Sequence, residues 1–157
     1  MPALRSQYSD RLDRLRAELA LTLASVCYIR DNLNRPEISR LAEFAAVKRA
    51  ATVGIEERLS DTYFIRLTAE FEGILKDYLS EYHPIIAVPD NVNFDWLISW
   101  VFRPKKIVNP AFRLQIDAVR KYRNAIAHRG AKPALVTFAQ ALQRLNRLIE
   151  LLPKPPD

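Results

Sequence analysis

Apolar residues recur every three or four positions along most of the chain, which is the spacing of one face of an α-helix. In residues 9–32 the apolar positions are Leu12, Leu15, Leu19, Leu23 and Val26. Prolines, asparagines and a glycine interrupt this spacing. We therefore predict six helices, at about residues 9–32, 36–52, 61–82, 93–102, 110–128 and 133–151.

The same spacing predicts which side chains face the core. In the last two helices the predicted inward residues are Phe112, Leu114, Ile116, Val119 and Ile126, then Leu135, Phe138, Leu142, Leu145, Leu148 and Leu151. The chain has only three glycines, which favours long uninterrupted helices. We predict one all-α domain over residues 1–157, a helical bundle of four main helices plus short extra helices, with residues 152–157 as a frayed tail.

Composition limits the cellular setting. No run of about 18 apolar residues exists, so no membrane partner is expected, and the N-terminus lacks the apolar core of a signal peptide. Cys27 is the only cysteine, which excludes a disulfide scaffold within one chain and favours a reducing, cytoplasmic location. We interpret Cys27 as a small buried hydrophobe.

Charge is distributed unevenly along the chain, whose net charge is +6. Residues 103–129 contain eight lysines and arginines and one acid, Asp117, whereas residues 56–81 are rich in glutamate and aspartate. A basic surface of this kind attracts a polyanion such as RNA. A solvated helix face without a ligand is the alternative interpretation.

One motif lies within this basic segment. Arg123, Asn124 and His128 fall at the end of the predicted helix 110–128. A histidine can exchange protons near neutral pH, an arginine matches a phosphate, and an amide can hydrogen-bond either one. No Cys/His cluster, Gly-rich phosphate loop or nucleophile turn occurs in the sequence, so we predict no metal and no cofactor.

The motif Arg-polar-x-x-x-His, near the end of the helix before the last one, resembles the signature of the HEPN superfamily. The resemblance covers about residues 61–151, and residues 67–79 are similar to a helix of bacterial branches in which an aromatic-Glu pair is common. It implies a metal-independent endoribonuclease in which His128 is the general base or acid, Arg123 stabilises phosphoryl charge and Asn124 orients the histidine or a phosphate. Arg120, Lys121 and Arg129 would then hold the RNA backbone.

The resemblance also implies partners. Such domains commonly form homodimers with two motifs facing one cleft, and a toxin–antitoxin or phage-defence role implies an antitoxin protein. In a regular helix Arg123 is rotated by roughly 140° from His128, which favours a site shared between two subunits. One toxin branch carries a tyrosine that is adenylylated two residues after the histidine. Gly130 stands there in this chain, which puts that control in doubt.

Two other functional classes remain open. The chain could be a non-catalytic RNA- or nucleotide-binding module, or a structural interaction domain in which Arg123 pairs with Glu70 or Glu72 and His128 caps a helix. The aromatic residues Trp96, Trp100 and Phe102 could stack on bases or belong to the core or a dimer interface. We interpret His83, which precedes a proline, as a surface residue.

Overall fold

The computed structural model describes residues 2–44, 54–83, 86, 88–89, 91–102, 109–128, 130 and 133–153. Within these residues every regular element is an α-helix: α1 (Pro2–Asp31), α2 (Pro36–Phe44), α3 (Ile55–Tyr82), α4 (Phe94–Phe102), α5 (Pro110–Ala127) and α6 (Phe138–Glu150). The predicted all-α class, with four main helices and short extra ones, is confirmed. No helix in the described ranges has both the length and the apolar content needed to cross a membrane.

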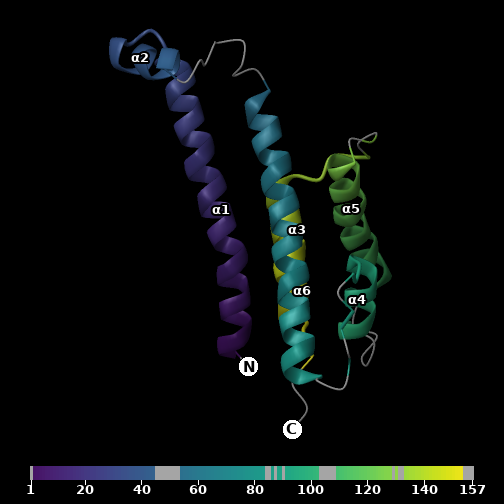
Figure 1. The fold of residues 1–157 in the computed structure, drawn as a ribbon. Coiled ribbons are helices and arrows are strands. Elements are labelled where there is room, and N and C mark those ends of the chain that lie inside the picture. The colour runs from purple at the N-terminus through teal and green to yellow at the C-terminus, as the bar shows by residue number, and fades with distance from the viewer. Residues whose placement is uncertain are drawn as a thin grey trace.

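Helix α3 lies at the centre of the bundle. It packs against α1, α4, α5 and α6, and α6 also contacts α1 and α5. Figure 1 shows α1, α3, α5 and α6 running in alternating directions, with α6 behind α3 in this view. The start of α1 and the end of α6 meet at one end of the bundle, where Arg5 Nη2 donates to the backbone oxygen of Leu152 over 2.6 Å.

Residues from all four main helices and from α4 form one hydrophobic core. On α1, Tyr8, Leu12, Leu15 and Leu19 are buried at spacings of four and three residues, as the sequence predicts for these leucines. Farther along α1, Leu23 and Val26 are only half-buried. Helix α3 has more fully buried side chains because other helices cover it on several sides: Phe64, Leu67, Phe71, Ile74, Leu75, Tyr78 and Leu79.

Among the first three helices, three ends differ from the prediction by several residues. Helix α1 begins at Pro2 rather than residue 9, because a proline is accepted in a first turn and Arg5 is tied to the far end of the chain. Helix α3 begins at Ile55 rather than residue 61, directly after Gly54, whose φ of 70° is left-handed. The predicted helix 36–52 ends at Phe44, and its remaining positions lie outside the described residues.

The start of α6 is set by a capping box that the apolar spacing did not reveal. The Thr137 hydroxyl accepts a hydrogen bond from the Gln140 backbone N–H over 3.2 Å, and the Gln140 side-chain oxygen accepts from the Thr137 N–H over 3.1 Å. The helix therefore begins at Phe138 rather than residue 133. Leu135, predicted for the core, is 70% exposed, whereas its neighbour Val136 is buried.

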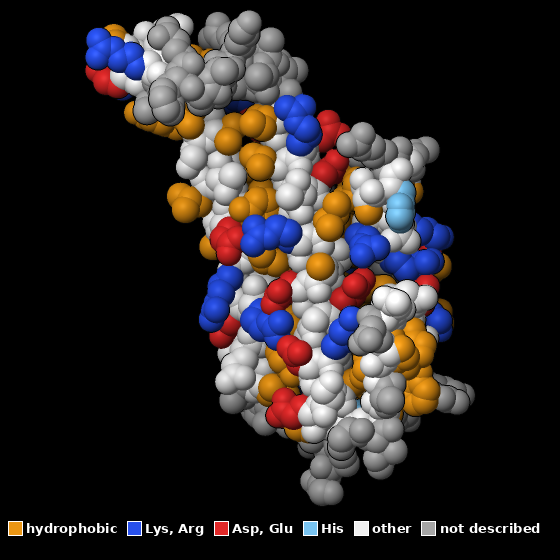
Figure 2. All heavy atoms as spheres, viewed as in Figure 1, with side chains coloured by type: hydrophobic (Ala, Val, Ile, Leu, Met, Phe, Trp, Pro, Cys, Tyr) orange, Lys and Arg blue, Asp and Glu red, His pale blue; other side chains and the backbone are white. Residues whose placement is uncertain are grey.

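The aromatic residues of α4 belong largely to the core. Phe102 is buried, which removes it as a platform for stacking bases. Trp96 and Trp100 are half-buried and pack against the core, with their ring centroids 5.6 Å apart. Hydrophobic side chains gather over α4 in Figure 2. The partial exposure of the two tryptophans leaves both the interface interpretation and the stacking interpretation open.

Candidate functional site

The motif lies at the end of α5, as the sequence predicts. At the start of this helix, the Asn109 side chain accepts from the Ala111 N–H over 2.8 Å and Pro110 occupies the first turn. At its end, His128 is the C-cap residue, and its backbone N–H donates to the Asn124 carbonyl over 3.0 Å. The cap fixes the backbone of the motif, because residues 124 and 128 are joined by this bond.

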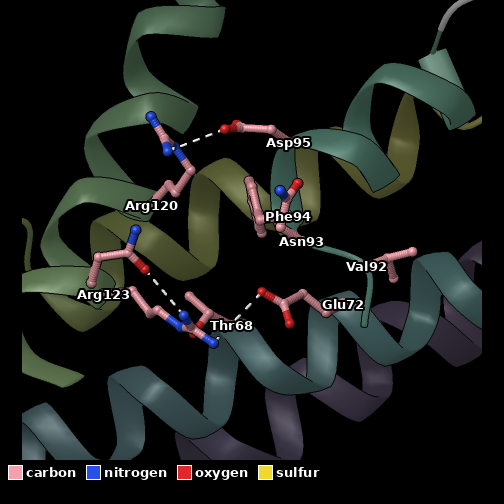
Figure 3. A pocket seen from close by; sticks show the side chains of 9 residues that line it. Thr68, Glu72, Val92, Asn93, Phe94, Asp95, Arg120 and Arg123 are labelled. Atoms are coloured by element: carbon pink, nitrogen blue, oxygen red, sulfur yellow. Dashed lines mark hydrogen bonds and ion pairs between the residues drawn. The ribbon is translucent and has the colours of Figure 1, made fainter. Parts of the chain in front are cut away.

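A cleft of about 310 Å³ opens between α3, α4 and α5 (Figure 3). Thr68 and Glu72 line it from α3, residues 92–95 from the start of α4, and Arg120, Arg123 and Asn124 from α5. The side chain of Asn93 caps α4 by accepting from the Trp96 N–H over 2.8 Å. Two of the predicted catalytic residues, Arg123 and Asn124, therefore share one cleft wall.

The three nitrogens of Arg123 differ in their partners. Nη1 donates to the Asn124 side-chain oxygen over 3.0 Å, and Nη2 lies 3.9 Å from Glu72 Oε1 (Figure 3). Nε is buried and has no hydrogen-bond partner among the described residues. The side chain remains 33% exposed. Arg123 thus presents a cation to the cleft that its neighbours only partly satisfy, which suits an oxygen ligand.

Glu72 is the acid that faces Arg123. It is one of the two acids, Glu70 and Glu72, expected to pair with Arg123 if the protein is a structural interaction domain. Its side chain is only 19% exposed, and this burial raises the pKa of the carboxyl, while the nearby cations Arg123 and Lys76 counteract the rise. Glu70, the other acid, pairs instead with Arg11 over 2.6 Å. The cleft therefore contains a half-buried carboxylate beside its arginine.

His128 is not brought to the cleft. Its side chain is exposed, it does not line the cleft, and no described residue forms a hydrogen bond or ion pair with its imidazole. One subunit therefore joins Arg123 to Asn124 but leaves His128 one helical turn farther along. This separation agrees with the rotation expected along a regular helix.

Two of the three predicted RNA-binding cations are engaged in ion pairs. Arg120 contacts Asp117 over 2.6 Å and Asp95 over 3.1 Å, which ties α5 to the start of α4. Lys121 contacts the other oxygen of Asp117 over 2.8 Å. These hydrogen bonds, from Lys121 first and Arg120 second, lower the pKa of Asp117. Arg129, the third cation, lies outside the described residues.

The charge of the basic segment is therefore reduced by nearby acids. Figure 2 shows positive and negative side chains interspersed on the described part of the viewed face. Asp95 lies on α4 and Glu72 on α3, so neither acid is among the charged residues of segment 103–129. The excess of positive over negative charge at the cleft is therefore smaller than the charges of residues 103–129 alone predict.

Other candidate groups contribute little at this site. No cluster of three or more His, Cys, Asp or Glu residues that could hold a metal ion occurs in the described parts of the chain. His83 caps the end of α3 and is half-buried, with its ring centroid 5.8 Å from that of Tyr78. Cys27 is half-buried, and its Sγ lies 3.7 Å from Glu56 Oε1.

The cleft contains residues that the motif did not indicate. Thr68, Asn93 and Asp95 are separated from Arg123 by at least one helix boundary, and no sequence spacing relates them to it. Comparison with family models, with curated proteins and with solved structures found no match to the chain. Function is therefore inferred from the cleft and from the end of α5.

Proposed function

We propose that the protein is a metal-independent endoribonuclease of HEPN type, acting on single-stranded or looped RNA. The supporting observation is Arg123, which lines a cleft that also holds Asn124 and whose Nη2 lies 3.9 Å from Glu72, beyond hydrogen-bond distance. An exposed histidine caps the same helix one turn farther along the chain. An arginine with unsatisfied donors is suited to a phosphate oxygen. An exposed imidazole is accessible to a substrate.

In the proposed reaction the 2′-hydroxyl of one nucleotide attacks the adjacent phosphorus. The bond from phosphorus to the 5′-oxygen of the next nucleotide breaks, leaving a 2′,3′-cyclic phosphate and a 5′-hydroxyl. His128 removes the proton from the attacking hydroxyl or supplies one to the departing oxygen. Arg123 stabilises the negative charge that develops on the phosphoryl oxygens, and Asn124 holds Arg123 in the cleft wall.

The site is proposed to be completed by a second copy of the chain. Within one subunit His128 does not line the cleft that contains Arg123. A two-fold axis would let His128 of one subunit approach Arg123 of the other, since an isologous interface presents each residue twice. We propose a cytoplasmic homodimer, and an antitoxin protein as the partner if the enzyme belongs to a toxin–antitoxin or phage-defence system.

A non-catalytic RNA- or nucleotide-binding module is the second candidate. It is favoured by the separation of His128 from the cleft that contains Arg123 and Asn124. Such a module would use Arg123 and the cleft amides for binding without proton transfer. Its binding would weaken with added salt, as phosphate contacts do.

RNA cleavage in excess EDTA tests the proposal. We expect the protein to cut RNA but not the DNA analogue, which lacks the attacking 2′-hydroxyl. His128→Ala should lower the cleavage rate by about 10²–10⁴-fold, the usual contribution of a general acid or base. His83→Ala is the matched control, because it removes the only other histidine and should leave the rate unchanged. Salt-sensitive RNA binding without cleavage would instead establish the binding module.

A further inference from the structure

Glu72 places a negative charge beside the cation that is proposed to hold the phosphate. Its Oε1 lies 3.9 Å from Arg123 Nη2, and its side chain points into the cleft from α3 (Figure 3). The carboxylate cannot turn fully to water, because the side chain is only 19% exposed. An anion bound at Arg123 would therefore lie close to a second, fixed negative charge.

The other charged groups around Glu72 leave this effect in place. Burial raises the pKa of Glu72, and Arg123 and Lys76, the latter on the same helix, counteract this rise by favouring the ionised form. Arg120 lines the cleft, but two carboxylates, Asp95 and Asp117, already contact it. The cleft consequently suits one negative charge at Arg123 better than two.

Phosphate groups of nucleic acids differ in this respect. An internal phosphodiester carries one negative charge. A terminal phosphate monoester has a second ionisation near pH 6 and carries about −1.5 to −2 at pH 7. Glu72 would repel the additional charge, because the repulsion between two like charges is strongest at short range.

We propose that Glu72 makes the cleft selective for internal phosphodiesters over terminal phosphates and free nucleotides. This inference rests on the proposed function of the cleft as a phosphate site, and it assigns the substrate class as the interior of an RNA chain. Glu72 acts as a specificity-determining residue: it lowers the affinity for dianions without contributing to proton transfer.

Two ligands that differ in one charge test the proposal. Adenosine 5′-monophosphate and its 5′-O-methyl ester share the base and sugar, and neither has the 3′-phosphodiester linkage that a 2′-hydroxyl would attack. Their dissociation constants are measured by calorimetry at pH 7.5 for the wild type, Glu72→Gln and Glu70→Gln. Glu70→Gln is the matched control, because it removes the same charge from α3 at a residue that pairs with Arg11 and does not line the cleft.

We expect the wild type and Glu70→Gln to prefer the methyl ester by about tenfold, and Glu72→Gln to lose that preference. A loss of folding in Glu72→Gln would weaken both ligands together, so the ratio of the two constants is the decisive quantity. An unchanged ratio in Glu72→Gln, or no binding of either ligand to the wild type, overturns the inference. RNA cleavage is measured separately: selectivity without cleavage removes the nuclease proposal alone, and cleavage with an unchanged ratio removes only the role of Glu72.

Discussion

Arg123 and His128 occupy different environments, although they are only five positions apart. Arg123 is two-thirds buried and contacts Asn124 and Glu72, whereas the His128 side chain is exposed at the end of α5. Removing Arg123 leaves the half-buried Glu72 carboxylate without the cation that faces it from α5. Burying a charge without a partner costs stability, so the two residues should differ in their contribution to folding.

We predict that His128→Ala changes the free energy of unfolding by less than about 0.5 kcal/mol, as most exposed substitutions do. Arg123→Ala should cost on the order of 1 kcal/mol, because a partly exposed ion pair and one hydrogen bond are lost. Urea unfolding followed by circular dichroism measures both variants.

Leu142→Ala is the positive control for this series, since Leu142 is 5% exposed and a buried leucine costs roughly 2–5 kcal/mol when truncated. If His128→Ala destabilised the protein as much as Leu142→Ala, His128 would be a packing residue. The proposed catalytic role would then lose its basis.

At the scale of single helices, α5 carries both the motif and the ion pairs that limit its positive charge. Asp117 accepts hydrogen bonds from Arg120, three residues on, and from Lys121, four residues on, which are the spacings that bring helical side chains together. Arg120 also reaches Asp95 on α4. These contacts position the α5 wall of the cleft relative to the start of α4.

We predict that Asp117→Asn destabilises the protein by up to about 1 kcal/mol at pH 7, the range of partly exposed ion pairs. Lys121 and Arg120 lower the pKa of Asp117 in the folded state, below its value of about 3.9 in an unfolded chain. The stabilisation is therefore fully present above about pH 4, and it is lost as the pH falls through the folded pKa. Unfolding measured from pH 7 to pH 3 should show the two proteins converging at the acid end.

Asp10→Asn serves as the control for charge alone, because Asp10 is an exposed carboxylate of α1. Its unfolding curve at pH 7 should follow the wild type, as for most exposed substitutions. A difference between Asp117→Asn and wild type that is as large at pH 3 as at pH 7 would mean that the carboxylate charge is not the source of the stabilisation.

In the molecule as a whole, the bundle places the cleft where the central helix α3 meets α4 and α5. The same arrangement leaves His128 outside the cleft of its own subunit. If catalysis requires both residues, two copies of the chain must combine. The composite site is therefore a testable property of the assembly.

We predict that mixing Arg123→Ala with His128→Ala restores part of the RNA cleavage that each variant alone lacks. Heterodimers would contain one intact cleft with Arg123 from one subunit and His128 from the other, so about a quarter of the original sites is the expected order of magnitude if subunits exchange freely. Cleavage rates of the mixture are compared with those of the separate variants. Exchange of the subunits is verified independently by a size-shifted fusion, and exchange without recovered activity would place the site within single subunits.

The local pattern of the chain determined which segments are helical and where the motif lies. Three- and four-residue spacing of apolar side chains predicted the buried leucines of α1 and most of the buried residues of α5 and α6. Asn109, Pro110 and Gly130 bracketed α5. These features depend on residues within one or two turns of each other, so a single sequence contains them. The position of Arg123, Asn124 and His128 at the end of α5 is of this kind.

The tertiary structure decided what the sequence pattern could not. Not every wrong prediction is of this kind: Leu114 is 72% exposed because it lies roughly 200° around α5 from Phe112 and Ile116, on the opposite face of the helix. Glu72 and Asp95 come to the cleft from α3 and α4, where packing of distant apolar faces brings them to Arg123 and Arg120. Such contacts depend on how whole helices pack, and no spacing along the chain encodes them.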